Sequence, residues 1–156
     1  MATAQRGSLD LSGIPSASGK RFALVVSEWN NHITDALAQG ARDTLEALGV
    51  KPSDIEDFAV PGSFELIHGC KAVAASLEFD AVIAIGSVIR GETAHFDFVC
   101  QGVTHGSAEL NAHGKVPVIF CVLTDDHEQQ SLDRCGGKLG NKGDEAAVAA
   151  VKMAQF

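Results

Sequence analysis

Apolar segments alternate with segments of helical periodicity from residue 21 to the C-terminus. Most of the apolar segments are short, rich in β-branched residues and apolar at successive positions. Strands that are buried on both faces of a parallel sheet have this pattern, because helices cover each face. The sequence predicts four such strands, over residues 21–27, 55–60, 80–86 and 116–123.

Between and after these segments, apolar residues recur every three or four positions, as on the buried face of an amphipathic helix. One such series runs from Ile33 to Leu48, and Gly49 supplies a helix stop. The same criterion predicts helices over residues 64–77, 95–112, 128–135 and 144–154. The alternation implies right-handed crossovers, so we expect an α/β fold: a three-layer α/β/α sandwich with a mainly four-stranded parallel sheet and flavodoxin-like alternation.

The first 20 residues are different in character. They are rich in Ser, Gly and Ala and have no hydrophobic periodicity. This composition predicts an extended N-terminal arm over residues 1–20, followed by a single domain over residues 21–156. Such arms fray or dock on a neighbour.

Composition narrows the class of protein. Twelve Lys and Arg against twenty Asp and Glu give a formal net charge of −8, which excludes a purely electrostatic nucleic-acid binder. No apolar stretch approaches the roughly 20 residues needed to cross a bilayer, so we expect no membrane partner and a cytoplasmic protein. The cysteines lack CxxC spacing, which is typical of small buried side chains in a reducing compartment; they are Cys70, Cys100, Cys121 and Cys135.

Ligands of open parallel sheets bind at the carboxyl ends of the strands. The segments that follow the predicted strands contain a Trp, a PGSFE turn, the run GSVIRGETAH and TDDH, at residues 27–31, 61–65, 86–95 and 124–127. None of them matches a Walker phosphate loop or a dinucleotide fingerprint, and the glycine-dense segment at 134–143 does not follow a strand. A flavodoxin-like nucleotide binder therefore ranks last among the hypotheses.

His95 is a candidate for proton transfer. Gly91, Glu92 and Thr93 precede it, after the most apolar strand, and would place hydroxyl and backbone donors beside an imidazole that titrates near neutral pH. The alternative is a helix-capping or surface histidine. His127 lies among acidic residues at a predicted helix start, and we interpret it as a capping or surface group. The other four histidines lack metal-ligand spacing, so the sequence does not support a zinc site.

Three of the twelve basic residues lie within nine positions, interleaved with glycines: Arg134, Lys138 and Lys142. Such a segment can bring cations and backbone N–H groups to an anionic ligand. It is equally typical of a solvated basic turn. The sequence leaves both interpretations open.

Aromatic and acidic side chains at the strand ends carry a similar ambiguity. Trp29, the only tryptophan, either stacks on a planar ligand or packs at the edge of the core. Phe64 and Phe120 have the same two interpretations. Glu65, next to the PGS turn, either accepts hydrogen bonds from a polyol or faces water.

Four blocks nevertheless keep a characteristic order and spacing: RFALVVSEWNNHI, VPGSFEL, AIGSVIRGETAHFDFV and VLTDDHEQQSLDRCGGKLGNKG, followed by an Ala-rich helix. On these blocks the chain resembles the lumazine synthase family from about Arg21 to the C-terminus. The resemblance implies condensation of 5-amino-6-(D-ribitylamino)uracil with 3,4-dihydroxy-2-butanone 4-phosphate to 6,7-dimethyl-8-ribityllumazine, phosphate and water, in riboflavin biosynthesis. It implies a transferase that uses no metal and no organic cofactor.

The resemblance also assigns roles to residues. The family's proton-transfer histidine falls on His95, and its phosphate contacts fall on Glu92, Thr93 and Arg134. A carboxylate would repel phosphate, so we expect a backbone N–H contact from Glu92. Arg134 is expected to be the main phosphate ligand, since a guanidinium presents a planar fork that fits phosphate.

Further assignments concern the pyrimidine substrate. Trp29 falls on the family's ring-stacking position, where Phe is commoner, and this departure suggests that flavin-like ligands such as riboflavin also bind there. The other matching positions are Ser63, Phe64 and Glu65 for the ribityl and pyrimidine contacts, Ser87, Val88 and Ile89 at the pyrimidine-side strand end, Phe120 supplied by a neighbouring subunit, and the active-site lysine Lys142.

The family's sites lie between subunits, so the resemblance implies a homopentamer in which Arg134 and Phe120 serve the adjacent chain's pocket. GGKLGNKG resembles the loop of members whose pentamers form icosahedral shells, which favours a shell, with riboflavin synthase as a candidate enclosed partner. The competing hypothesis is a non-catalytic lumazine- or flavin-binding shell or scaffold protein. A binder would not need the full set of Thr93, His95, Arg134 and Lys142, so their joint presence favours the enzyme.

Overall fold

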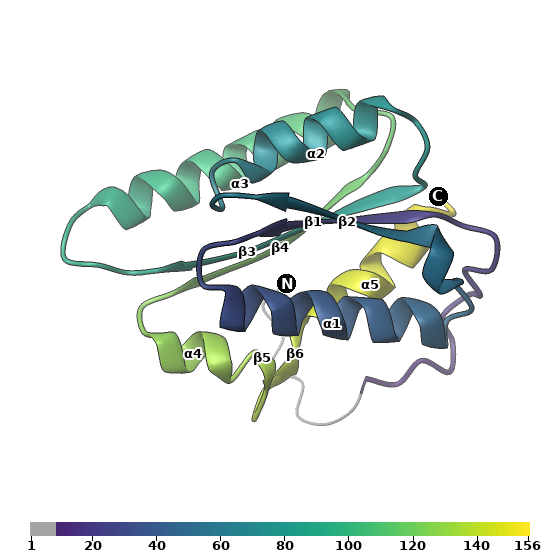
Figure 1. The fold of residues 1–156 in the computed structure, drawn as a ribbon, viewed down its shortest axis with the longest axis horizontal. Coiled ribbons are helices and arrows are strands. Elements are labelled where there is room, and N and C mark those ends of the chain that lie inside the picture. Colours follow the sequence, from purple (N-terminus) through teal and green to yellow (C-terminus); the bar gives the residue numbers. More distant parts are fainter. Residues whose placement is uncertain (1–8) are drawn as a thin grey trace.

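A four-stranded parallel sheet forms the centre of the molecule in the computed structural model, which describes residues 9–156 (Figure 1). Its strands lie in the order β2-β1-β3-β4, so the first strand of the chain is internal and both outer positions are reached by crossovers. Every neighbouring pair is parallel. The bounds are β1 Phe22–Ser27, β2 Ile55–Val60, β3 Ala81–Ile89 and β4 Val118–Asp125.

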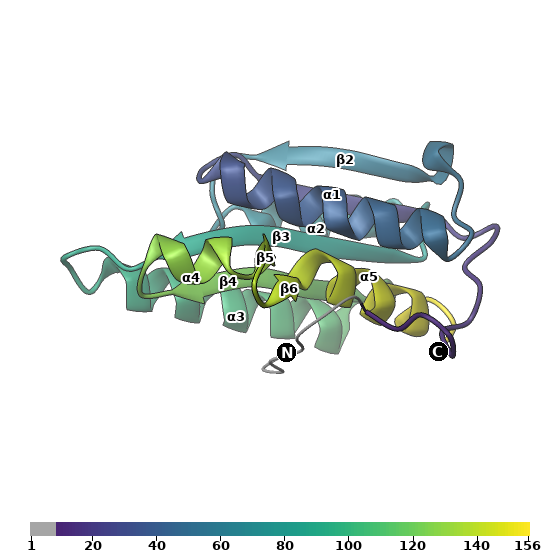
Figure 2. The same cartoon turned by 90° about the horizontal axis from the view of Figure 1, so that it is seen from below.

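Helices cover both faces of this sheet, which confirms the predicted three-layer α/β/α sandwich (Figures 1 and 2). α2 (Leu66–Ala75) and α3 (His95–His113) lie on one face. α1 (Asn31–Ala47), the short α4 (Glu128–Leu132) and α5 (Lys142–Met153) lie on the other. A single 3-10 turn, η1 (Pro52–Asp54), leads into β2.

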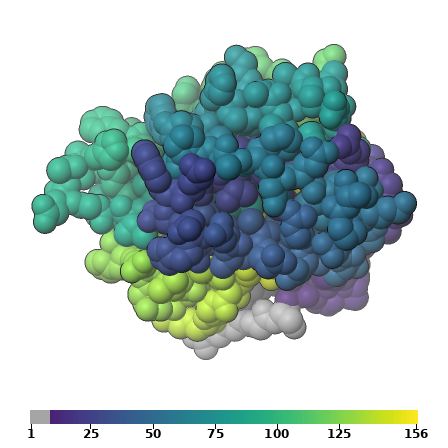
Figure 3. All heavy atoms as spheres, in the orientation of Figure 1, coloured from purple at the N-terminus to yellow at the C-terminus, as the bar shows by residue number. Residues whose placement is uncertain are grey.

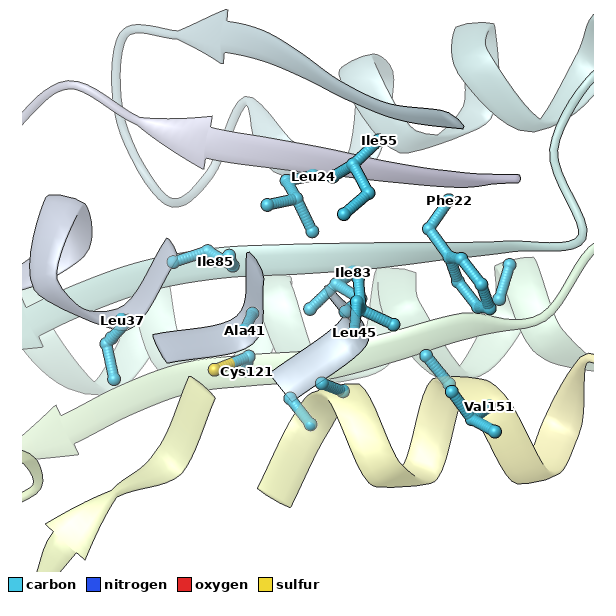
Figure 4. Close-up of a cluster of buried hydrophobic side chains, with 14 of the residues drawn as sticks. Phe22, Leu24, Leu37, Ala41, Leu45, Ile55, Ile83, Ile85, Cys121 and Val151 are labelled. Carbon is cyan, nitrogen blue, oxygen red and sulfur yellow. The ribbon is translucent and has the colours of Figure 1, made fainter. Parts of the chain in front are cut away.

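The core divides into two clusters because successive side chains of a strand point to opposite faces. Phe22 and Leu24 of β1 pack in the layer beneath α1 and α5, whereas Ala23 and Val25 pack beneath α2 and α3. Figure 4 shows the first layer, where the sheet residues meet Leu45 of α1. Both faces of β1 are therefore apolar, as its sequence predicted.

Two elements differ most from the sequence-based expectation, whereas the ends of β4, α2 and α5 are shifted by only one or two residues. The helix predicted over 128–135 ends at Leu132, and an antiparallel hairpin of β5 (Cys135–Gly137) and β6 (Gly140–Asn141) follows it. Within this hairpin Gly136 and Gly140 have φ values of 116° and 78°, a backbone conformation that favours glycine. β3 also continues beyond residue 86 to Ile89, because its last residues still pair with β4.

The segment before β1 packs against its own chain. Ala17 is fully buried, its N–H donates to Leu48 O at 2.8 Å, and Ile14 packs on the same core cluster. Gln155 Nε2, near the C-terminus, donates to Ser16 O at 3.0 Å. The predicted arm therefore has a docked part, while residues 1–8 lie outside the described residues. Between residues 9 and 156, no helix is both long and apolar enough to cross a membrane.

Candidate active site

A pocket of about 520 Å³ opens at the carboxyl ends of β1, β2 and β3, where ligands of parallel sheets bind. Side chains from two strand-to-helix connections, from the end of β3 and from the start of α3 line it. Eight of the predicted site residues meet there. The lining is Trp29, Asn30, Ser63, Phe64, Glu65, Ser87, Val88, Ile89, His95, Phe98 and Val99.

Trp29 presents its ring to this pocket rather than to the core, since 67% of the residue is exposed. Its backbone N–H donates to Pro61 O at 3.0 Å, which joins the connection after β1 to the one after β2. A β-carbon at Gly62 would lie 2.6 Å from Trp29 Cε3, so the indole lies directly against glycine. One side of the tryptophan therefore packs against Gly62, and most of the rest of the side chain is exposed.

Asn30 lines the pocket although sequence reasoning missed it. Its φ of 59° is left-handed, a conformation that asparagine tolerates better than most residues, and it precedes α1. Its Nδ2 donates to Ser87 O at 3.1 Å. The sequence signal was an Asn at a strand-to-helix connection next to the aromatic residue.

Two polar atoms of the pocket residues are buried without a hydrogen-bond partner among residues 9–156: Glu65 Oε2 and Ser87 Oγ. Unsatisfied buried polar atoms are rare in folded proteins and are expected to find partners. Ser63 is also buried, and a β-carbon at Gly86 would lie 2.6 Å from its Oγ. The glycine thus leaves room for the serine, and the residues that carry these buried polar atoms line the pocket.

His95 is the first residue of α3 and is exposed at the pocket. Its backbone N–H donates to Thr93 Oγ1 at 3.4 Å. Phe98, one turn later, is 70% exposed and lines the same pocket, and sequence reasoning missed it. Its three-residue spacing from His95 on the predicted helix was the available signal.

The loop between β3 and α3 carries Glu92 and Thr93, and both are exposed. This loop projects from the body of the molecule in Figures 1 and 3. Neither residue lines the pocket that contains His95.

Three predicted site residues lie elsewhere in the same chain. Phe120 and Lys142 line a separate pocket of about 200 Å³ beside β4 and α5, where Lys142 Nζ pairs with Glu145 at 2.5 Å. Arg134 follows α4, and its Nη1 donates to Gln130 O at 2.8 Å. The structure therefore does not bring Arg134, Lys142 and Phe120 together with His95 within one chain.

Lys138 is engaged in a local contact: its Nζ lies 2.8 Å from Asp133 Oδ2. Hydrogen bonds from Lys138 and Gln129 lower the pKa of Asp133 below its usual value. In the basic cluster, Lys138 and Lys142 therefore each have a carboxylate partner in the same chain.

The remaining candidate groups have structural roles. His127 precedes α4 and takes part in a capping box with Gln130, in agreement with the capping interpretation. Cys70 and Cys121 are buried, as predicted, but Cys100 and Cys135 are only partly buried, so the prediction was wrong for these two. Burial raises the pKa of the Cys70 and Cys121 thiols to about 12. No group of three or more His, Cys, Asp or Glu side chains in residues 9–156 is arranged to hold a metal ion.

Comparison with known proteins identifies the family. A family model described as 6,7-dimethyl-8-ribityllumazine synthase matches residues 19–156. The chain belongs to this family. Proteins named 6,7-dimethyl-8-ribityllumazine synthase from Christiangramia forsetii and Parabacteroides distasonis are 57% and 53% identical to it. The first alignment covers 94% of this chain and 88% of the relative, and the second covers 100% and 99%.

Membership confirms the resemblance given by the four sequence blocks. The family match covers the whole sheet and all five α-helices. A relative from Porphyromonas gingivalis with the same name is 50% identical over 99% of this chain and 97% of its own length.

Proposed function

We propose that this chain is a lumazine synthase that condenses 5-amino-6-(D-ribitylamino)uracil with 3,4-dihydroxy-2-butanone 4-phosphate to 6,7-dimethyl-8-ribityllumazine, phosphate and water. The observation that carries the proposal is the pocket in which an exposed Trp29, unpaired polar atoms and His95 meet. The family match supports the same reaction. The reaction needs no metal or organic cofactor.

The pyrimidine substrate binds against Trp29, whose exposed ring offers a face for stacking. Its ribityl hydroxyls reach the carboxylate of Glu65 and the hydroxyl of Ser63, which lie on the connection after β2. The pyrimidine edge contacts the end of β3, at Ser87, Val88 and Ile89. Phe64 closes the apolar side of the pocket, and 57% of it is exposed.

His95 carries the protons in this scheme. Attack of the substrate amine on the ketone gives a Schiff base, phosphate leaves, and ring closure follows. These steps move protons on and off nitrogen and oxygen, and an imidazole can do both near neutral pH. Its place at the pocket, within reach of a bound pyrimidine, supports this role.

The phosphate of the second substrate is held by Thr93, by the backbone N–H of Glu92 and by Arg134 of an adjacent subunit. The separation of Arg134, Phe120 and Lys142 from the His95 pocket within one chain supports a site that two chains complete. The exposed aromatic residues Phe64, Phe98 and Phe120 support it further, because large exposed apolar side chains mark interaction surfaces. Since the resemblance to the lumazine synthase family implies pentamers, we propose that the assembly is a homopentamer.

Three further expectations belong to this proposal. The pentamers assemble into an icosahedral shell, riboflavin synthase is a partner, and the protein acts in the cytoplasm. Residues 134–143, which resemble the family's loop in shell-forming members, support the first of these.

The second candidate function is a binding or scaffold protein without turnover, which the aromatic pocket alone would also serve. Mixing the purified protein with both substrates and following the absorbance of the lumazine product separates the two. The enzyme forms product faster than the spontaneous reaction, and an Arg134→Ala variant loses that rate. A folded, assembled protein that only matches the spontaneous rate would be a binder.

A further inference from the structure

Arg90 joins two parts of the chain that carry proposed active-site residues. It is the first residue after β3, and its backbone N–H donates to Asp125 O at the end of β4, at 3.0 Å. Its guanidinium Nε donates to Asp126 Oδ1 at 2.7 Å. From the same group, Nη2 lies 3.2 Å from Asp97 Oδ1, and Nη1 lies 3.4 Å from Asp97 Oδ2.

The Asp97 contact reaches the first turn of α3, two residues beyond His95. The guanidinium also lies over the ring of Phe96, with its Cζ 4.1 Å from the ring centroid. Phe96 is buried, so Arg90 is braced against a fixed surface. A planar group held by stacking, by one hydrogen bond and by a further ion-pair contact to the same carboxylate orients the helix start.

The Asp126 contact reaches the turn that begins α4. Asp126 N–H donates to Gln130 Oε1 at 2.8 Å, and the backbone oxygen of Gln130 accepts from Arg134 Nη1 at 2.8 Å. A chain of three contacts thus runs from Arg90 to the guanidinium of Arg134.

We propose that Arg90 is a positioning residue that sets both His95 and Arg134 through Asp97 and Asp126. This inference rests on the roles proposed above for His95 and Arg134. Because these two residues serve different pockets of the assembly, one Arg90 acts on two neighbouring sites.

A purely stabilising role makes a different prediction. The side chains of Arg90, Asp97 and Asp126 are 41%, 48% and 58% exposed, and exposed ion pairs contribute little to stability. Arg21 provides a matched control at the opposite end of the sheet. It also pairs with two carboxylates, Glu56 and Glu78, and also lies over a phenylalanine ring, at 5.0 Å.

The test is steady-state kinetics with both substrates, together with thermal unfolding, for Arg90→Ala, Arg90→Lys, Asp97→Asn, Asp126→Asn and Arg21→Ala. We expect Arg90→Ala to lower kcat by about tenfold and to raise KM for the phosphorylated ketone. Asp97→Asn should lower kcat alone, and Asp126→Asn should raise that KM alone. Arg90→Lys should recover only part of the loss. It keeps the positive charge, but a single ammonium cannot pair with both carboxylates.

Parental kinetics for Arg90→Ala, or an equal kinetic loss in Arg21→Ala, would overturn the inference. If Arg90→Ala does not fold, the test rests on the two aspartate variants. Asp97→Asn should then lower kcat alone and Asp126→Asn should raise KM alone, and the absence of this difference would also overturn the inference. His95→Ala and Arg134→Ala are measured in the same experiment. They distinguish a failure of the positioning role of Arg90 from a failure of the proposed active site. If they are slow while the Arg90 variants are parental, only the positioning role fails; if they are parental themselves, the proposed site fails.

Discussion

Gly62 and the indole of Trp29 are in direct contact: a β-carbon at position 62 would lie 2.6 Å from Trp29 Cε3 and 2.7 Å from Cζ3. A Gly62→Ala substitution must therefore push the ring away. Since Trp29 is largely exposed, the ring can move at small cost in stability, but it leaves its stacking position. We expect Gly62→Ala to raise KM for the pyrimidine with little change in the unfolding temperature.

The control for this substitution is Gly13→Ala, because a β-carbon at Gly13 meets nothing within 4 Å. It should leave both KM and stability at their parental values. A Gly62→Ala protein with parental KM would show that the position of the indole does not matter for binding.

Riboflavin binding to Trp29 gives a direct optical signal. The chain has one tryptophan and no tyrosine, so its near-ultraviolet-excited emission reports on position 29. Stacking of an isoalloxazine ring on the indole should quench this emission in a saturable titration. Emission that stays constant up to the solubility limit of riboflavin would remove the hypothesis.

His95→Ala should slow turnover without abolishing it. General acid–base assistance contributes roughly 10²–10⁴ in rate, whereas holding the two substrates together contributes independently of the imidazole. His105→Ala is the matched control, because His105 is exposed on the same helix. Product formation by His95→Ala at the parental rate would contradict the proton-transfer role.

The cysteines should react in two classes. Burial raises the pKa of Cys70 and Cys121 to about 12, so at pH 8 only about 10⁻⁴ of either thiol is ionised. Cys100 and Cys135 are only partly buried. Iodoacetamide at pH 8 should therefore modify these two in the native protein and all four after unfolding, as read by mass spectrometry.

The same two thiols make stability depend on pH. The native protein retains thiol protons that the unfolded chain releases above its ordinary pKa of 9.0. Since the native state then binds more protons than the unfolded state, the free energy of unfolding falls as pH rises from about 9 to about 12. Cys70→Ala combined with Cys121→Ala should flatten that decline in urea titrations, and an unchanged slope would contradict the assignment.

The sheet and its helices could be predicted from sequence because most strands have apolar residues at successive positions, as β1 does, and alternate with helical periodicity. The β5–β6 hairpin could not, since its glycines act through backbone angles that a hydrophobic pattern does not encode. The site residues divide in the same way, into those placed by the sheet topology and those placed by local conformation. Trp29, Glu65 and His95 meet because parallel strands end at one edge, whereas Asn30 and Phe98 enter through a turn conformation and a helix face.

The separation of Arg134 from His95 could not be predicted from the hydrophobic pattern of a single chain. The hydrophobic pattern places His95 at the start of one predicted helix and Arg134 at the end of another, but it does not say how far apart they lie. In the structure, Arg134 lies between α4 and the hairpin, on the sheet face opposite α3 (Figure 1). Only a resemblance to proteins with shared sites predicted that separation.

Complementation between two impaired variants tests the central claim that His95 and Arg134 from different chains form one site. His95→Ala and Arg134→Ala chains, unfolded together and reassembled at equal amounts, should regain about one quarter of parental activity, because random mixing gives that fraction of sites both intact residues. The variants assembled separately and then mixed are the control. Activity no higher than that control would contradict the claim, since it would mean that both residues act within one chain.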